Sequence, residues 1–304
     1  MTSHQPFIGS EAVKAGTLRK HQLRGGFRAV YPDVYVRRDQ RLTLCERAVA
    51  AWLWSHRQGV LAGLTAAAWH GSKWVDECLP VELVWSNARP PRGVRTYDVR
   101  LLPHESRLVA GVPATTAERT AFDIGRRAPI GTAIARLDAL TRATETKPSE
   151  ILALADQHRG ARGIRQLETA LELVDPGSQS PKETWLRLLL IRAGFPRPAT
   201  QIPVLAHGGQ VYYLDMGWED LMVAAEYDGE QHRLDRWQYA WDIRRSEALA
   251  RVGWIVIRVT ATDHEPDIVR RVGDARGSRA SSLRTDRCRS RKSRAERRLG
   301  EIGG

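Results

Sequence analysis

The sequence predicts a mixed α/β (α+β) protein with an N-terminal winged helix, an α/β middle domain and a C-terminal domain of order α-β-β-β-α-β. Three observations carry this prediction. Two short helical runs and a hairpin pattern fill the first 40 residues, helical periodicity dominates residues 41–174, and three strand-like runs follow a linker at 175–181. A chain of 304 residues has room for two or three domains.

The first 40 residues have the order helix, helix, hairpin. Residues 10–16 and 17–26 are short helical runs that end in glycine, and residues 27–39 alternate like a hairpin with its turn at Tyr31-Pro32-Asp33. This is the order of a winged helix, whose second helix can enter a DNA groove. The basic side chains of that helix are Arg19, Lys20, His21 and Arg24. The alternative is that they form only a solvated helix face.

The middle domain is expected to mix helices and strands. Thr116 precedes a helix in which Arg119 and Asp123 lie one turn apart, an arrangement typical of a capped helix with an internal ion pair. His70, at the end of an alanine-rich helix, is more often a cap or a satisfied core group than a ligand. Helices are expected over 42–56, 59–71, 115–127 and within 131–174, and strands over 81–86 and 96–102.

Three segments of this half resemble a known family. Residues 25–36, 59–71 and 111–127 are together similar to the N-terminal and middle regions of AbiEi-type antitoxin proteins, which combine a winged helix with an α/β domain. The resemblance spans roughly residues 10–128 and rests on structural motifs without catalytic groups. The chain departs from the family pattern at Asp33, where a glycine is usual, and at Leu61-Ala62. A cognate toxin or regulatory partner is what the resemblance implies.

The C-terminal domain, residues 182–275, begins after the Pro-, Gly- and Ser-rich linker. Ser180 and Glu183 form a capping-box pattern at the start of its first helix, which gives Glu183 a structural role. The remaining elements are expected as strands over 199–205, 208–218 and 219–229, a helix over 236–253 and a strand over 254–260. On that helix, the spacing of Trp237 and Trp241 favours core packing over a contact with DNA.

Carboxylates gather near the ends of two neighbouring strands. Asp215 lies late in the second strand and Glu226 late in the third, and alternation turns Asp228 to the same face as Glu226. Three converging carboxylates would shift one another's pKa values unless a cation neutralised them, and oxygen ligands suit Mg²⁺ or Mn²⁺. Such a metal site can hydrolyse phosphodiesters, with His232 placed to move protons.

The alternative is structural, because Asp-Gly pairs are common in turns and Asp228-Gly229 could be one. Against that alternative, Glu226 follows the apolar run Met222–Ala225. Burying a carboxylate without a role in such surroundings would cost folding free energy.

These residues carry a second resemblance. Leu214-Asp215, the run from Ala225 to His232, the helix turn from Asp242 to Arg245 and the strand around Arg258 are similar to a small endonuclease-like family related to very short patch repair (Vsr) nucleases. That family has a restriction-endonuclease-like, PD-(D/E)XK-type fold, and the similarity covers roughly residues 180–273.

The resemblance assigns roles to these positions. It implies Asp215 and Glu226 as metal ligands, Glu183 as a helper and His232 as a general acid or base. Arg245 and Arg258 would face phosphate or anchor Asp242. In the broader superfamily the motif ends in Lys, where this chain has Asp228. His232 or Arg245 would then have to substitute for the missing cation.

The net charge of +12 invites a nucleic-acid interpretation, but residues 276–304 alone hold ten Lys or Arg against three acidic residues. With few apolar side chains, that tail is expected to be a disordered, phosphate-binding or solubilising arm. Three scattered cysteines indicate neither a disulfide framework nor a zinc site. No apolar run is long enough for a membrane helix and no signal peptide is visible, so the expected location is the cytoplasm.

The leading function is Mg²⁺-dependent hydrolysis of DNA phosphodiesters. The rival is a non-enzymatic, DNA-binding, antitoxin-like regulator whose nuclease-like domain is inactive. A nuclease restrained by its own N-terminal half is a third reading. DNA is the expected partner in all three, and whether the protein acts as a homodimer stays open.

Overall fold

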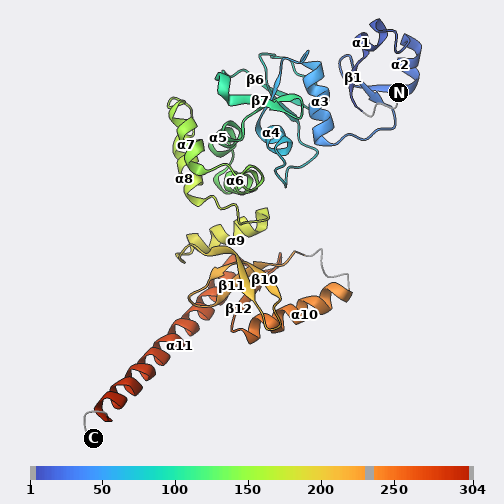
Figure 1. Ribbon diagram of the computed structural model, residues 1–304. Helices are drawn as coiled ribbons and strands as arrows, with labels where there is room; N and C mark the ends of the chain where they lie inside the picture. Colours follow the sequence, from blue (N-terminus) through green and yellow to red (C-terminus); the bar gives the residue numbers. More distant parts are fainter. Residues whose placement is uncertain (1–4, 230–235, 301–304) are drawn as a thin grey trace. The chain divides into compact units, whose positions relative to one another are not determined.

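The structure, a computed structural model, describes residues 5–229 and 236–300, and for 236–239 and 286–300 it describes the backbone alone. It is a mixed α/β protein with three sheets among these residues (Figure 1). Two compact units divide between Pro176 and Gly177, within the segment 175–181. No helix in the described part combines the length and the apolar character that crossing a bilayer requires.

The chain begins with two short helices and a three-stranded sheet of order β1-β3-β2. Asp33, with a positive φ of 60°, makes the tight turn of the β2–β3 hairpin, and its carboxylate accepts hydrogen bonds from Ser10. The elements are β1 (Phe7–Ile8), α1 (Gly9–Lys14), α2 (Lys20–Gly26), β2 (Phe27–Tyr31) and β3 (Val34–Arg37). The predicted order helix, helix, hairpin is present.

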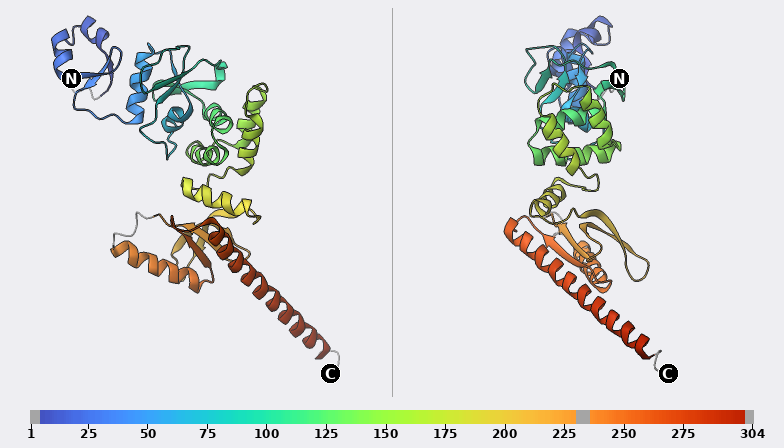
Figure 2. Two further views of the ribbon diagram at one scale, coloured as in Figure 1. Left: turned by 180° about the vertical axis from the view of Figure 1, so that it is seen from behind. Right: turned by 90° about the vertical axis from the view of Figure 1, so that its left-hand side faces the viewer.

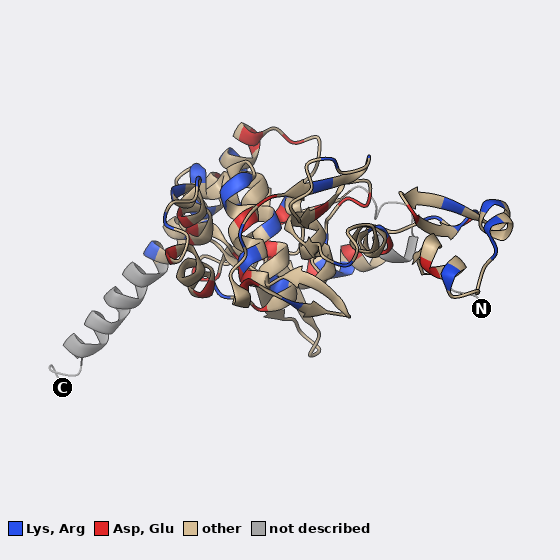
Figure 3. Cartoon of the chain, turned by 90° about the horizontal axis from the view of Figure 1, so that it is seen from above, with Lys and Arg blue, Asp and Glu red and all other residues tan. Residues whose placement is uncertain are grey.

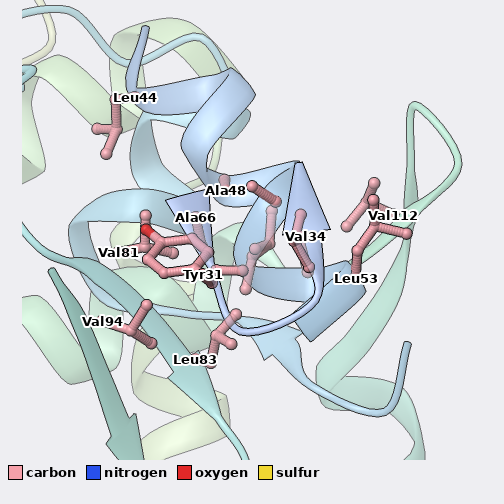
Figure 4. Close-up of a cluster of buried hydrophobic side chains, with 14 of the residues drawn as sticks. Tyr31, Val34, Leu44, Ala48, Leu53, Ala66, Val81, Leu83, Val94 and Val112 are labelled. Atoms are coloured by element: carbon pink, nitrogen blue, oxygen red, sulfur yellow. The ribbon is translucent and has the colours of Figure 1, made fainter. Parts of the chain in front are cut away.

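This N-terminal segment shares a core with the residues that follow it. Ile8, Tyr31 and Val34 belong to the same buried cluster as Leu44 and Leu83, and Figure 4 shows several of these side chains together. The expected boundary at residue 40 therefore does not separate two cores. The physical reason is that three short strands bury too little apolar surface alone, so the sheet packs on α3 (Leu44–Trp54).

The rest of the first unit is a five-stranded sheet of order β6-β5-β4-β8-β7 with helices around it. Thr116 caps α5 as predicted, since its side chain accepts a hydrogen bond from the Arg119 N–H. The strands are β4 (Val60–Leu61), β5 (Val81–Val84), β6 (Val94–Tyr97), β7 (Ser106–Val109) and β8 (Val112–Thr115). The helices are α4 (Gly63–Trp69), the 3₁₀ turn η1 (Pro103–Glu105), α5 (Ala117–Arg127), α6 (Ile130–Thr144), α7 (Pro148–Asp156) and α8 (Ile164–Leu173).

The second unit is a four-stranded sheet of order β12-β11-β10-β9. Its elements are α9 (Pro181–Arg192), β9 (Ala199–Leu205), β10 (Val211–Trp218), β11 (Val223–Tyr227), α10 (Arg236–Arg251), β12 (Ile255–Val259) and α11 (Glu265–Gly300). β9, β10 and β11 form the predicted antiparallel meander, and β12 runs parallel to β11 after α10. One buried cluster joins the sheet to α9 and α11, and another joins it to α10.

The C-terminal end differs from the expected disordered arm. α11 begins at Glu265 and continues to Gly300 (Figure 2). Its first turns are anchored because Ile268 and Val272 are fully buried, and the Arg276 guanidinium lies 4.4 Å from the centre of the Trp218 ring. Arg, Ala and Leu favour helix, so a basic composition does not by itself prevent the helix from continuing. The expected domain end at residue 275 thus falls inside a helix.

Candidate functional site

Strand pairing in the second unit aligns three predicted site residues. Met216 of β10 pairs with Ala225 of β11, and continuing this antiparallel register by one residue places Asp215 beside Glu226. Glu226 pairs in turn with Arg258 of the parallel strand β12. An acid, a second acid and an arginine therefore follow one another across three strands.

Asp215 is a largely buried acid that is short of compensating charge. Burial, followed by the nearby charges of Glu183 and Glu226, raises its pKa to about 7. The Tyr227 N–H donates a hydrogen bond of 3.1 Å to its Oδ2, which offsets only part of that effect. At neutral pH this carboxyl group is consequently divided between its neutral and charged forms.

Glu226 is buried, with 7% of its surface exposed, and is held by Arg245 of α10. Both guanidinium Nη atoms of Arg245 donate to the two carboxylate oxygens, at 2.9 and 2.5 Å. Arg245 also donates to the Tyr213 carbonyl at 2.7 Å. The hydrogen bonds to Glu226 raise the pKa of Arg245, so the guanidinium keeps its positive charge in this pair.

Glu183 serves two roles at the start of α9. Its Oε1 accepts from the Ser180 hydroxyl at 2.9 Å and its Oε2 from the Gln179 N–H at 2.8 Å. The Ser180 hydroxyl oxygen accepts in return from the Glu183 N–H, so Ser180 caps the helix as predicted, while the described hydrogen bonds of the Glu183 carboxylate go to the Gln179 N–H and the Ser180 hydroxyl. The charge of Glu183 nevertheless acts on Asp215, because it contributes to the raised pKa there.

Asp215, Glu226 and Arg245 line a hollow of about 400 Å³, which we call the acid cleft. Its lining residues are Val211, Tyr212, Tyr213, Asp215, Glu226, Tyr227, Asp228, Trp241, Asp242, Arg245 and Arg258. Trp241, expected to pack in the core, is 46% exposed and makes an edge contact with Tyr212. The three tyrosines that line the cleft, Tyr212, Tyr213 and Tyr227, were not predicted as site residues. Their signal was the alternation along β10, which leaves Val211 and Tyr213 exposed.

The fit of a divalent cation to the acid cleft is mixed. Among the described residues, no group of three or more His, Cys, Asp or Glu is placed to hold a metal ion. Asp228 lies beyond the end of β11 and also lines the cleft, and its N–H donates to the Val259 carbonyl. Asp215 and Glu226 still supply excess negative charge and oxygen ligands, the chemistry that Mg²⁺ prefers. Two protein carboxylates with water completing the shell is a common arrangement for that ion.

Other predicted residues have different positions from those expected. Arg245 was expected to face phosphate or to anchor Asp242, but it binds Glu226, because α10 crosses above that carboxylate. Arg258 lines the acid cleft and donates to the Ser246 hydroxyl at 2.7 Å. His232, the expected general acid or base, lies outside the described residues, as does the side chain of Trp237.

The predicted basic residues of the N-terminal segment are exposed on α2. Arg19, Lys20, His21 and Arg24 are all solvent-accessible, and Figure 3 shows Lys and Arg on this part of the chain. Among the described residues, none of the three cations Arg19, Lys20 and Arg24 has an acidic partner within ion-pair distance. Arg38 of the hairpin donates to the carbonyls of Arg24 and Gly25 and so fixes the end of the helix.

A second buried group of charges lies in the middle domain, and we call it the middle-domain ion cluster. Arg119 is its centre, 2.6 Å from Glu105 and 2.9 Å from Asp123. Burial alone would raise the pKa of Glu105, but the Leu102 N–H, His158 and Arg119 together hold it below its ordinary value. The full cluster comprises Glu105, Arg119, Asp123, Arg126, Arg127 and His158.

His70 confirms its expected structural role. It is the C-cap of α4, and its Nε2 lies 2.7 Å from the Thr115 carbonyl oxygen. A satisfied side chain at a helix end needs no ligand.

Comparisons with known proteins bear on the first unit. Residues 58–173 match the model of a family described as the AbiEi antitoxin C-terminal domain. Two uncharacterized proteins of Mycobacterium tuberculosis, from strains CDC 1551 and H37Rv, are each 27% identical over 239 residues, covering 79% of this chain and 87% of the relative. The expected antitoxin resemblance is thus present in part: the match begins at residue 58 rather than near residue 10, and it extends to residue 173 rather than 128. The middle of the chain is similar to the AbiEi antitoxin C-terminal domain.

Proposed function

We propose that this protein is an antitoxin-like DNA-binding regulator. The observation that carries the proposal is the match of residues 58–173 to an antitoxin domain, in a chain whose helix α2, nearer the N-terminus, exposes cations that have no acidic partner among the described residues. In this proposal α2 is the DNA-reading helix of a winged helix. A cognate toxin is the partner that the antitoxin domain implies.

The distribution of charge supports DNA contact by the N-terminal segment. Residues 1–43 carry eight Lys or Arg and three Asp or Glu, whereas residues 44–275 carry 29 of each kind. The net positive charge of residues 1–275 is therefore concentrated in the first 43 residues. Phosphate neutralisation by Lys and Arg supplies most non-specific affinity for DNA, so this segment has the charge that binding requires.

The test is the binding of the full chain to a 30-base-pair duplex, measured by fluorescence anisotropy over a range of salt concentrations. A triple variant, Arg19→Ser with Lys20→Ser and Arg24→Ser, removes the exposed cations of α2. We expect its affinity to fall at least about tenfold at 0.1 M salt and the salt slope to decrease by roughly 2 to 3, because each phosphate contact contributes about 0.9 to that slope.

The matched control removes three exposed cations from the rest of the first unit: Arg107→Ser with Lys147→Ser and Arg165→Ser. It changes the net charge equally and should leave affinity and slope nearly unchanged. Equal losses in both triple variants would mean that only total charge matters. That result would remove α2 from the proposal.

A second candidate function is metal-dependent hydrolysis of nucleic-acid phosphodiesters in the acid cleft. The observation in its favour is the buried carboxyl group of Asp215, whose pKa is raised to about 7 first by burial and then by the nearby charges of Glu183 and Glu226. Asp215 and Glu226 would hold the cation, and Mg²⁺ when bound would supply Lewis acidity toward phosphate oxygens. Arg258 would face the phosphate from β12, and His232 stays the expected proton-transfer group.

Incubation of supercoiled plasmid with the protein and Mg²⁺ or Mn²⁺ tests this candidate. The variants are Asp215→Ala and Glu226→Gln, and Asp220→Asn in the exposed turn before β11 is the control. Nicking by the wild type and Asp220→Asn, but by neither site variant, would support hydrolysis. If the wild type and the three variants all fail to nick the plasmid, and duplex binding depends on α2, the regulator would be the only one of the two candidate functions left.

A further inference from the structure

We propose that Arg245 is a built-in competitor of a divalent cation for Glu226. The inference rests on the second candidate function, because it concerns the same cleft. The guanidinium engages both oxygens of the Glu226 carboxylate, at 2.9 and 2.5 Å. A cation that used this carboxylate as a ligand would meet a positive charge already in direct contact with it.

Arg245 is fixed in this position by more than one interaction. Its Nη2 also donates to the Tyr213 carbonyl on β10, at 2.7 Å. The side chain is therefore tied to β10 and β11 at once and is only 11% exposed. A bidentate, largely desolvated pair of this kind is among the stronger hydrogen-bonded ion pairs in proteins. A cation must displace or share that pair, which weakens its apparent binding.

The other arginine of the cleft shows that pairing with the acids is specific to Arg245. Arg258 lies beside Glu226 in the strand register, yet its described side-chain contact is the hydroxyl of Ser246. Position in the cleft alone thus does not bring a guanidinium onto the carboxylate. The arrangement gives the cleft two states: one in which Arg245 neutralises Glu226, and one in which a cation takes its place.

In functional terms, Arg245 would keep the acid cleft of the C-terminal unit from binding a cation. While Arg245 occupies Glu226, the acid pair is incomplete as a metal site, and the domain can fold and bind nucleic acid without acting on it. This links the two candidate functions, because a regulator that carries a nuclease-like domain needs that domain held inactive.

The experiment measures Mn²⁺ binding to the full chain at pH 8, by the loss of the electron paramagnetic resonance signal of free Mn²⁺. The variants are Arg245→Gln, which cannot neutralise Glu226, and Arg245→Lys, which keeps the charge but can engage only one oxygen well. We expect Arg245→Gln to bind Mn²⁺ about 10- to 100-fold more tightly than the wild type, because it removes a positive charge that contacts the ligand carboxylate and repels the cation. Arg245→Lys should lie between the two.

Arg244→Gln is the matched control, since its side chain is exposed on the same helix and bonds only to the Ala240 carbonyl among the described residues. Asp215→Ala reports whether binding occurs in the acid cleft. Melting curves show that each variant is folded, and Arg245→Lys keeps the test valid if Arg245→Gln unfolds.

Four outcomes are distinguishable. Tighter binding in Arg245→Gln, lost on adding Asp215→Ala, supports the competition. Unchanged binding, or weaker binding, in both Arg245 variants overturns it while leaving a cation site in place. No Mn²⁺ binding by any variant at millimolar concentration removes the cation site, and with it both the second candidate function and this inference.

Discussion

The middle-domain ion cluster and the acid cleft are both groups of buried charges, but they differ in balance. In the cluster, two carboxylates face three arginines and His158. In the acid cleft, Asp215 and Glu226 lie near the charge of Glu183, and among the described residues of the cleft one guanidinium, that of Arg245, pairs with an acid. The two environments shift carboxyl pKa values in opposite directions: Glu105 below its ordinary value and Asp215 up to about 7.

The difference separates a group that stabilises the fold from one that is prepared for a ligand. Where every buried acid has a basic partner, ionisation is favoured and the charges are satisfied within the protein. Where acids outnumber bases, the fold itself is penalised at neutral pH, and any cation or proton that binds relieves the penalty. Strongly perturbed acids in a cleft are for this reason candidates for functional sites.

The largest expected effect comes from removing the centre of the ion cluster. Arg119→Met leaves Glu105 and Asp123 buried beside fewer partners, and an unpaired buried charge typically costs about 3–5 kcal/mol. Denaturant unfolding of the full chain measures the loss. The control Arg107→Met, at an exposed position on β7, should change stability by less than about 0.5 kcal/mol. A loss under about 1 kcal/mol in Arg119→Met would show that the cluster is not a stabilising group.

The acid cleft predicts a change of opposite sign. Asp215 has a raised pKa in the folded state, so its ionisation disfavours folding: stability falls as pH rises from about 4 to 7, and the penalty is complete above pH 7. Asp215→Asn removes this penalty. In buffer with EDTA, we expect the variant to be more stable than the wild type by about 2–4 kcal/mol at pH 8 and nearly equal to it at about pH 4.

Calorimetry at both pH values measures this difference. Glu219→Gln, in the exposed turn after β10, is the control and should show no comparable gain. A variant Asp215→Asn that is less stable than the wild type at pH 8 would mean that Asp215 is compensated by a partner, and the contrast with the ion cluster would be lost.

Local sequence signals predicted the elements of both regions well. Thr116 and Ser180 mark helix starts because a side-chain oxygen satisfies a free N–H, a rule that depends only on neighbouring residues. The positive φ values of Gly208 and Gly209 agree with the predicted turn between β9 and β10. The strand order of the second unit follows from such local features and from the length of the segment between β11 and β12.

Pairing between charges could not be predicted in the same way. Arg119 and Asp123 were expected to interact because they lie one turn apart, but Glu105 and His158 come from segments 53 residues apart. Arg245 was assigned to phosphate or Asp242, whereas α10 brings it onto Glu226, which lies 19 residues away. The angle at which a helix crosses a sheet decides such contacts, and no spacing rule in the sequence specifies that angle. The sequence predicted the gathering of acids around Asp215 and Glu226, but it did not predict that Arg245 pairs with Glu226.

The smallest expected effect is on the middle-domain ion cluster, in which the buried acids have basic partners. Glu105→Gln keeps the shape of the side chain but removes its charge from Arg119 and His158. The pKa of Glu105 is lowered on folding, so its charge contributes stability that is present above the unfolded pKa and is lost as pH falls through the lower folded value. We expect a loss of about 1–3 kcal/mol at pH 7 in denaturant unfolding, the range for hydrogen bonds to charged groups, and a smaller loss at pH 3. Because Asp215→Asn should stabilise where Glu105→Gln destabilises, equal signs for the two variants at neutral to alkaline pH would show that charge balance does not distinguish the two clusters.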